Sequence, residues 1–214
     1  MSGAGGHEDR LAWFDELYRR AGDDADAVPW SRAGPHPGLD HWAKSAIGRG
    51  AGHAGRAIDV GCGLGDNAEF LASLGYDVTA FDLSETAIDW AKRRFSDTAV
   101  SYAVADLFAL PVEWHGAFDL VSEVYTLQAL PADLRQGALR AIAGLVAPGG
   151  RIVVVCLARD EDEHADGPPW PLARSELSGF GDAGLAPVTF EDVVLGDNQR
   201  RHFVAVYERA EPET

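Results

Sequence analysis

The sequence contains little cysteine, little positive charge and no long apolar run. Cys62 and Cys156 are the only cysteines among 214 residues, which excludes a disulfide-rich scaffold and favours a reducing, cytoplasmic setting. No apolar stretch approaches the length of a membrane span, and residues 1–10 carry neither the basic nor the apolar region of a secretory signal. We therefore expect a cytoplasmic protein with no membrane partner.

Positive charge is scarce throughout the chain. There are 18 Lys and Arg residues against 34 Asp and Glu residues, which gives a formal net charge of −16, and basic runs stay short. Such a field repels phosphate backbones, so we expect no nucleic-acid partner. A neutral or cationic small molecule is favoured instead, and the oligomeric state stays open between monomer and homodimer.

Helix-like and strand-like patterns alternate along most of the chain. A short amphipathic helix is predicted over residues 11–21, and residues 22–40 form an irregular segment rich in Pro, Gly and Asp. Beyond them, short apolar runs alternate with segments of helical period. The predicted strands cover 57–60, 77–82, 101–106, 118–125 and 151–158, and the predicted helices cover 66–75, 84–95 and 131–146. This alternation is typical of a doubly wound α/β fold with a mostly parallel sheet.

The order of elements changes after residue 158. An acidic loop precedes a helix around 171–185 and two alternating runs at 188–195 and 201–209, which we expect to form strands six and seven as an antiparallel pair at one edge. The chain therefore reads as one domain over 1–214. Its parts are an N-terminal helical lid segment at 1–50, a core at 55–158, and a lid loop, helix and edge strands at 159–214.

A glycine-rich turn follows the first core strand in AIDVGCGLGDN, residues 57–67. Gly61 and Gly63 match the first two glycines of the dinucleotide-binding pattern G-x-G-x-x-G, but the position of its third glycine holds Asp66, and Gly65 stands one residue earlier. A carboxylate at position 66 would repel a pyrophosphate. Asp66 suits a cationic ligand or a helix cap instead. The turn therefore favours a nucleotide cofactor without a diphosphate.

Two carboxylates at later strand ends narrow the choice of cofactor. Asp82 ends the second core strand, where it can accept both hydroxyls of a ribose, although Asp is also a common turn residue. Asp106 ends the third, where it can accept from an exocyclic amine while Leu107 packs on a purine. An adenosine without phosphate, beside groups that tolerate positive charge, points to S-adenosyl-L-methionine (SAM), with S-adenosyl-L-homocysteine as the product.

The ordered motifs AIDVGCGLG, FDLS, AVADLF, FDLVSEVYTLQALP and LVAPGGRIVVV resemble those of class I SAM-dependent methyltransferases over about residues 55–158. The resemblance implies a Rossmann-like sheet of seven strands with strand seven antiparallel. It also implies that Asp59 and the glycine turn hold the methionine end, near Glu123, while Asp82 binds the ribose. The expected cofactor-binding residues are Trp30, Asp59, Gly61, Cys62, Gly63, Gly65, Asn67, Asp82, Leu83, Asp106, Leu107 and Glu123.

A second, shorter resemblance involves PWSRAGPHP at residues 29–37, which is similar to the thiopurine S-methyltransferase-like branch. It implies that Trp30 contacts the cofactor, and it makes Arg32 and His36 candidates for the acceptor side. Trp30 could equally be a hydrophobic clasp for the N-terminal segment. Tyr125 either stabilises the sulfonium by a cation–π contact or packs beneath the cavity. The predicted catalytic residues are thus Tyr125, Glu123, Arg32 and His36.

The expected reaction is direct in-line transfer of a methyl group to an S, N or O nucleophile of a small molecule, which requires alignment in a dry cavity. The sequence marks no general base, since His36, His41, His115 and His164 are scattered. No metal site is expected: the acidic run at 160–167 reads as a solvated loop, which could act as a lid. Two alternatives stay open, a non-catalytic SAM-binding sensor or partner subunit and, more remotely, a nicotinamide-dependent oxidoreductase.

Overall fold

Seven strands form one sheet in the order β3-β2-β1-β4-β5-β7-β6; β7 is antiparallel to both neighbours, and all other pairings are parallel. The computed structural model describes residues 11–22, 24–47, 55–196 and 198–212, so residues 1–10, 23 and 48–50 of the predicted lid segment lie outside the described residues. The strands are β1 (Arg56–Val60), β2 (Asp77–Asp82), β3 (Ser101–Val104), β4 (Phe118–Val124), β5 (Val146–Leu157), β6 (Leu185–Leu195) and β7 (Arg200–Arg209). The predicted Rossmann-like, doubly wound sheet with an antiparallel seventh strand is confirmed.

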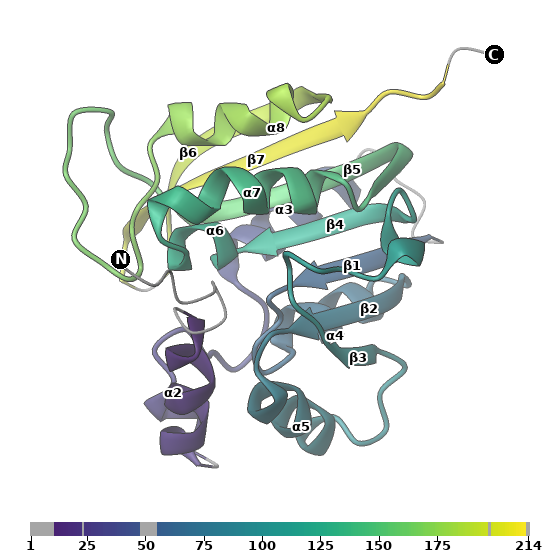
Figure 1. The fold of residues 1–214 in the computed structure, drawn as a ribbon, viewed down its shortest axis with the longest axis vertical. Coiled ribbons are helices and arrows are strands. Elements are labelled where there is room, and N and C mark those ends of the chain that lie inside the picture. Colours follow the sequence, from purple (N-terminus) through teal and green to yellow (C-terminus); the bar gives the residue numbers. More distant parts are fainter. Residues whose placement is uncertain (1–10, 23, 48–54, 197, 213–214) are drawn as a thin grey trace, which may run out of the picture.

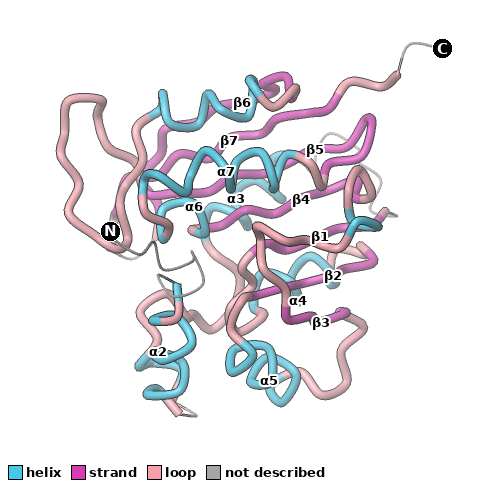
Figure 2. Tube along the Cα trace, in the orientation of Figure 1, coloured by secondary structure: helices cyan, strands magenta, loops and turns pink. Residues whose placement is uncertain are grey.

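Helices cover both faces of this sheet (Figure 1). One face of the sheet is covered by α3 (Pro37–Ile47), α4 (Asp66–Ser73) and α5 (Glu85–Arg94). The opposite face is covered by α7 (Ala132–Ala143) and α8 (Gly179–Asp182). The short α6 (Thr126–Ala129) follows β4, and α2 (Trp13–Ala21) packs against α5. The loops that leave β1, β2 and β4 lie on the side of the sheet where α2 is found (Figure 2).

Two apolar layers hold the helices to the sheet, and a third, smaller cluster holds the N-terminal segment. One layer joins Leu39 of α3 and Leu71 of α4 to the sheet, while the other joins Ile142 of α7 and Phe180 of α8 to its opposite face. The third cluster contains Tyr18, Val28, Leu64, Ala87 and Trp90, so it links the segment before residue 31 to the glycine turn and α5. Burial of such side chains contributes about 1.5–3 kcal/mol each.

Some predicted elements have different bounds. Residues 22–40 are not wholly irregular, because α3 begins at Pro37, a residue whose fixed φ suits the first turn of a helix. The predicted helix around 171–185 is reduced to a 3₁₀ turn at Arg174–Ser178 and the four residues of α8. Gly179, Gly181 and Gly184 lie in or beside α8, and glycine disfavours continuation of a helix.

The central strands also differ from their predicted limits. β5 begins at Val146 rather than residue 151, because Val146 already pairs with Phe118 of β4; the pairing then shifts register before Arg151, and Gly149 within this irregularity has φ 71°. β4 ends at Val124, since Tyr125 adopts a left-handed conformation with φ 71°. The expected antiparallel pairing of strands six and seven is present, but β7 lies between β5 and β6. Within the described part of the chain, no helix is long and apolar enough to cross a membrane.

Candidate active site

A cavity of about 420 Å³ lies where the loops after β1, β2, β3 and β4 meet the N-terminal segment. Its lining includes the glycine turn, the ends of β2 and β4, and side chains of α2 and of residues 29–36. Pro168 and Pro169 of the acidic loop and Asn198 and Arg200 beside β7 complete it. Parallel sheets commonly bind ligands at this edge, beyond the carboxyl ends of the strands.

The glycine turn brings backbone close to the cavity. Gly61 and Gly63 have φ values of 63° and 52°, and a β-carbon on either would collide with Thr126 or with the Tyr18 hydroxyl. These two positions therefore require glycine for conformation and for space. Cys62 also lines the cavity, but its N–H donates to the Phe81 carbonyl at 2.9 Å, so that N–H is used within the protein. Burial raises the pKa of the Cys62 thiol well above its usual value.

Asp82 lies beside this turn and orients it. Its carboxylate accepts from the N–H of Gly63 at 2.9 Å and, through the other oxygen, from the N–H of Ser84 at 2.9 Å. Burial raises the Asp82 pKa, and the three backbone N–H groups of Gly63, Leu83 and Ser84 oppose that shift. Each carboxylate oxygen has a further lone pair, so Asp82 can also accept from a ligand in the cavity.

Asp106 and its neighbours form the adjoining wall. The Asp106 carboxylate accepts from the N–H of Phe108 at 2.9 Å, and Leu83, Leu107 and Phe108 also line the cavity. Apolar side chains therefore flank a carboxylate that can accept from a polar edge. We call Gly61, Gly63, Asp82, Asp106 and Leu107 the glycine-turn side of the cavity.

Asp66 is engaged within the protein. Both of its oxygens contact the Arg94 guanidinium, at 2.8 and 2.9 Å, and one also accepts from the Gly34 N–H at 3.3 Å. Gly65, with no side chain to serve as a cap, occupies the N-cap position of α4. Asp66 is therefore paired with an internal cation, and the expectation that it caps the helix is wrong.

Three predicted cofactor residues, Asp59, Gly65 and Glu123, do not line the cavity. Asp59 and Glu123 each stand one residue before a lining residue, Val60 and Val124, and alternate strand residues face opposite ways. Burial raises the pKa of each carboxyl to about 7. The Tyr102 hydroxyl occupies the space over Gly65. These three residues nevertheless adjoin residues that do line the cavity: the Gly65 N–H donates to the Cys62 carbonyl at 3.0 Å, the Asp59 carboxylate adds to the effect of burial in raising the pKa of Cys62, and Glu123 pairs in register with Val60.

Trp30 joins the N-terminal segment to the glycine turn. Its indole N–H donates to the Tyr18 hydroxyl at 2.7 Å, and its ring contacts Trp13, Phe14 and Tyr18 edge to face. Trp30 lines the cavity, and its indole nitrogen would lie 3.8 Å from a β-carbon on Gly63. Trp30 therefore packs the N-terminal segment against the glycine turn and also lines the cavity. These positions suit both roles that the sequence left open for it, a hydrophobic clasp and a cofactor contact.

Hydrogen-bond donors without partners gather on another wall. The buried Nε of Arg32, Nε2 of His36 and Nε2 of Gln128 have no hydrogen-bond partner among the described residues. All three residues line the cavity, as do Tyr125 and Arg200. We call these five residues the arginine side.

The backbone fixes two of these side chains as donors toward the cavity. The Gly38 N–H donates to His36 Nδ1 at 3.1 Å, so the neutral ring carries its proton on Nε2. The Leu157 N–H donates to Gln128 Oε1 at 2.6 Å, which leaves the Gln128 amide group unpartnered. Burial, with His202 and Arg32 nearby, lowers the His36 pKa to about 3. The Asn67 side chain accepts from the His36 N–H at 2.9 Å and so ties the segment to α4.

Tyr125 connects the arginine side to β7. Its hydroxyl lies 2.7 Å from His202 Nε2, and the His36 ring stands 4.6 Å from the Tyr125 ring, centroid to centroid. The other scattered histidines are absent from the cavity lining: His41 pairs with Glu191, and His115 and His164 are exposed. His202 is buried behind Tyr125.

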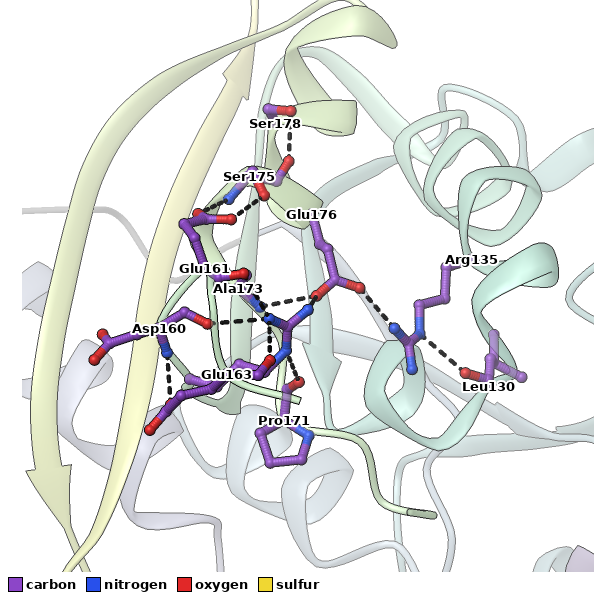
Figure 3. A network of polar contacts seen from close by, with 11 residues as sticks. Leu130, Arg135, Asp160, Glu161, Glu163, Pro171, Ala173, Ser175, Glu176 and Ser178 are labelled. Carbon is purple, nitrogen blue, oxygen red and sulfur yellow. Dashed lines mark hydrogen bonds and ion pairs between the residues drawn. The ribbon is translucent and has the colours of Figure 1, made fainter. Parts of the chain in front are cut away.

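A polar network anchors the acidic loop that supplies Pro168 and Pro169. Arg159 donates to the carbonyls of Asp160, Glu163 and Pro171 and pairs with Glu176 at 2.6 Å. Figure 3 shows Glu176 also facing Arg135, and Glu161 turned toward Ser175. Pro168 and Pro169, which follow the acidic run, line the cavity, whereas the next residue, Trp170, does not. Among the described residues, no group of three or more His, Cys, Asp or Glu is placed to hold a metal ion.

Comparison with known proteins identifies the family. Residues 57–150 match the family described as a methyltransferase domain. The chain is 28% identical over 182 residues to the "probable thiol methyltransferase 2" of Arabidopsis thaliana, covering 82% of this chain and 74% of that protein. It is 34% identical over 156 residues to the ubiquinone biosynthesis O-methyltransferase of Xanthomonas campestris pv. campestris, covering 72% of this chain and 62% of that protein.

A solved structure shares the fold. The Burkholderia thailandensis 1,6-didemethyltoxoflavin-N1-methyltransferase, with bound 1,6-didemethyltoxoflavin and S-adenosylhomocysteine, superposes with a TM-score of 0.75 at 19% identity, covering 99% of this chain and 93% of that one. The chain is a class I SAM-dependent methyltransferase. The cofactor predicted from the sequence is therefore confirmed as SAM, and the nicotinamide alternative is not supported.

The cavity of this methyltransferase suits SAM in its volume and in the residues that line it. Gly61 and Gly63 present bare backbone in the cavity lining, and the cavity volume falls in the usual range of small-molecule sites. Asp82 and Asp106 offer carboxylates, and aromatic rings lie beside the turn, as suits a ligand that carries a sulfonium. Sequence reasoning missed Gln128, Arg200 and His202, although each lies within a few residues of a strand end at this edge.

Proposed function

We propose that this methyltransferase transfers a methyl group to an S, N or O nucleophile of a small molecule by direct in-line displacement. The observation that carries the proposal is the extension of the cavity beyond the glycine-turn side to the donor-rich arginine side. A protein that only bound SAM would be expected to fill that space with its own side chains. The cavity instead offers room beside the cofactor region for a second molecule.

The unpartnered donors indicate what the acceptor molecule carries. Buried N–H groups of Arg32, His36 and Gln128 each leave a desolvation cost of about 1–3 kcal/mol when unpaired, so a bound molecule that supplies acceptor oxygens, nitrogens or sulfur is favoured. Arg32 and Arg200 add positive charge in a chain whose net charge is −16. The proposed acceptor is therefore rich in hydrogen-bond acceptors or anionic, and an acidic macromolecular surface such as DNA or RNA is disfavoured by the total charge.

The glycine-turn side is the proposed cofactor site. Gly61, Cys62 and Gly63 would hold the methionine end, Asp82 with Leu83 the ribose, and Asp106 with Leu107 the adenine. Asn67 would hold the covering segment in place through His36, and Trp30 would contact the cofactor from that segment. When bound, SAM supplies a methyl group on a sulfonium, an electrophile that needs no metal. The chain's own task is alignment of the two molecules and exclusion of water.

Finer assignments belong to the same proposal. The thiopurine S-methyltransferase-like branch is favoured by the segment 29–37, and the Arabidopsis relative described as a thiol methyltransferase makes S-methylation a reasonable first test. We infer one methyltransferase domain over 1–214, acting as a monomer or homodimer in the cytoplasm, away from membranes. The two cysteines, both unpaired, suit a reducing compartment.

The test is a screen of thiols, phenols and amines with labelled SAM, scored by methylated product. We expect turnover of at least one class and SAM binding in calorimetry, while NAD gives no binding. Gly63→Val is the matched negative control, because its side chain would run into the Tyr18 hydroxyl. SAM binding without turnover of any acceptor would favour the sensor or partner-subunit alternative, and binding of NAD alone would contradict the family assignment of the site.

A further inference from the structure

We propose that Tyr125 and His202 form a proton relay that removes the proton of the methyl acceptor, with Tyr125 as the catalytic residue and His202 as the positioning residue behind it. The inference rests on the proposed function and assigns a role to a histidine outside the cavity lining. It also supplies the general base that the sequence did not mark.

The hydrogen bonds of His202 determine where its proton lies. Nδ1 is 2.7 Å from the carbonyl oxygen of Arg200, and a carbonyl can only accept, so Nδ1 carries a proton. In the neutral ring Nε2 then has a free lone pair. The Tyr125 hydroxyl, 2.7 Å away, must donate to it. The Tyr125 oxygen therefore retains its lone pairs for a group in the cavity.

The surroundings keep both residues neutral at rest. Burial raises the Tyr125 pKa to about 12 and lowers the His202 pKa. The charged and titratable groups that face the pair are Arg32 from the covering segment, Arg200 at the start of β7, His36 beside α3 and Cys156 on β5. Both arginines disfavour a protonated imidazole, so a proton taken up by His202 would be returned readily to solvent.

Other groups on the arginine side are poorly suited to accept a proton. His36 accepts a backbone N–H at Nδ1 and carries its own proton at Nε2, so it can only donate toward the cavity. Gln128 uses its oxygen on the Leu157 N–H, and a guanidinium has no lone pair to offer. Tyr125 instead offers an oxygen already hydrogen-bonded to a base.

The backbone fixes Tyr125 at this position. Its φ of 71° is rare for a bulky residue, and backbone strain of this kind clusters at functional sites. The Tyr125 N–H donates to the Val155 carbonyl at 3.0 Å, which holds the residue between the end of β4 and α6. This conformation places the ring in the cavity lining and the hydroxyl against β7.

The step balances in atoms and charge. The acceptor atom forms a bond to the methyl carbon as the carbon–sulfur bond breaks, and that electron pair stays on sulfur. The acceptor's proton passes to the Tyr125 oxygen, and the Tyr125 proton passes to His202 Nε2. The positive charge that was on the sulfonium is then on the imidazolium, whose Nδ1–H remains on the Arg200 carbonyl.

The test uses Tyr125→Phe and His202→Gln in the full chain with SAM and a panel of phenols and thiophenols of graded acidity. Gln keeps an acceptor for the Tyr125 hydroxyl but takes up no proton. We expect both variants to lower kcat about 100-fold for the least acidic phenol, with the loss shrinking to less than about threefold for thiophenols already ionised at the assay pH. His202→Gln should also remove the fall in kcat on the acid side of the pH profile.

Matched controls are Tyr207→Phe, whose hydroxyl contacts the Leu177 carbonyl away from the cavity, and His41→Gln, both expected to leave kcat unchanged. A second readout needs no turnover: nitrogen NMR of the protein alone should show His202 neutral and protonated at Nδ1 near pH 7. An equal loss for all acceptors, an unchanged acid limb or a proton on Nε2 would overturn the relay. A wild-type chain that methylates neither this panel nor the thiols, phenols and amines of the screen contradicts the proposed function, and the NMR result separates that failure from a wrong relay geometry.

Discussion

The two sides of the cavity differ in how their polar groups are satisfied. On the glycine-turn side, the Asp82 and Asp106 carboxylates already accept backbone N–H groups, so that wall is held in place by the protein itself. On the arginine side, donors on Arg32, His36 and Gln128 have no partner among the described residues. The comparison indicates that the glycine-turn side is preformed for one ligand, the cofactor. The donors of the arginine side become paired only when a second molecule binds.

The two sides also differ in origin. The glycine-turn side comes from strand ends within residues 57–107, where each strand, turn and helix follow one another directly. The arginine side combines Arg32 and His36 with Tyr125 and Gln128 and with Arg200, which are far apart in the sequence. Changes on one side should therefore leave binding to the other largely intact, and the variants below test that independence.

The largest effect is expected for Asp82→Ala. Loss of charge-assisted hydrogen bonds, together with a Gly63 N–H left without its acceptor, should weaken SAM binding by about 2–3 kcal/mol, roughly 30- to 150-fold in Kd. Calorimetric titration with SAM measures it. Asp77→Ala, at the exposed start of the same strand, is the control and should bind as the wild type does. An unchanged Kd in Asp82→Ala would refute the ribose assignment.

Glu123→Gln should have the next largest effect, on stability rather than binding. Glu123 lacks a partner for Oε2, and burial raises its pKa to about 7 from an ordinary 4.5. Between these two pH values the folded protein keeps Glu123 protonated, whereas the unfolded chain releases that proton. The contribution of this proton to the free energy of unfolding is fully present below pH 4.5 and is lost as the pH rises through about 7. Gln keeps the bond from the Leu127 N–H without the titration. The variant should be about 2 kcal/mol more stable than wild type at pH 8 and similar at pH 4.

Urea unfolding at the two pH values measures this difference. Glu208→Gln, a partly exposed carboxylate paired with Arg151 on the sheet, is the control. Parallel pH dependences for Glu123→Gln and wild type would show that Glu123 is ionised in the folded protein. That result would restore it as a candidate for direct contact with the cofactor's ammonium or sulfonium.

Arg32→Gln tests the arginine side. Removal of the half-buried guanidinium should raise the KM of the acceptor found in the screen about tenfold, close to 1.4 kcal/mol, while the Kd of SAM stays the same. Steady-state kinetics at saturating SAM and calorimetry separate the two quantities. Arg19→Gln on the exposed surface of α2 is the matched control. Equal weakening of SAM and acceptor would mean that the two sides are not independent.

The sequence predicted the glycine-turn side well for a physical reason. A parallel strand, a tight turn and a helix start are encoded within a few residues, so Gly61, Gly63 and Asp82 can be placed from local pattern alone. The same reasoning assigned Asp59 and Glu123 to the methionine end of the cofactor; they lie next to the lining residues Val60 and Val124 and not in the lining itself. Strand alternation gives two possible faces, and the local pattern does not say which one meets the ligand.

The arginine side was less predictable because it depends on long-range pairing. β7 runs antiparallel, so its first residues, not its last, reach the active edge of the sheet, where His202 pairs with Leu157 of β5. A search for functional groups after each strand therefore passes over His202. Gln128 was missed for a different reason: its role depends on the Leu157 N–H, which fixes the direction of its amide.

Trp30→Ala should produce the smallest change in binding, and it should affect SAM and the acceptor together. Trp30 belongs to the same N-terminal segment as Arg32, yet its indole donates to Tyr18 over Gly63. Its loss should raise the KM of SAM and of the acceptor together, each by about fivefold or 1 kcal/mol, because the segment would cover the cavity less often. Trp30→Phe keeps a ring without the N–H, so it should retain most of the packing. If Trp30→Ala lowers the melting temperature while both KM values stay constant, Trp30 is a clasp only, and the arginine side is positioned without it.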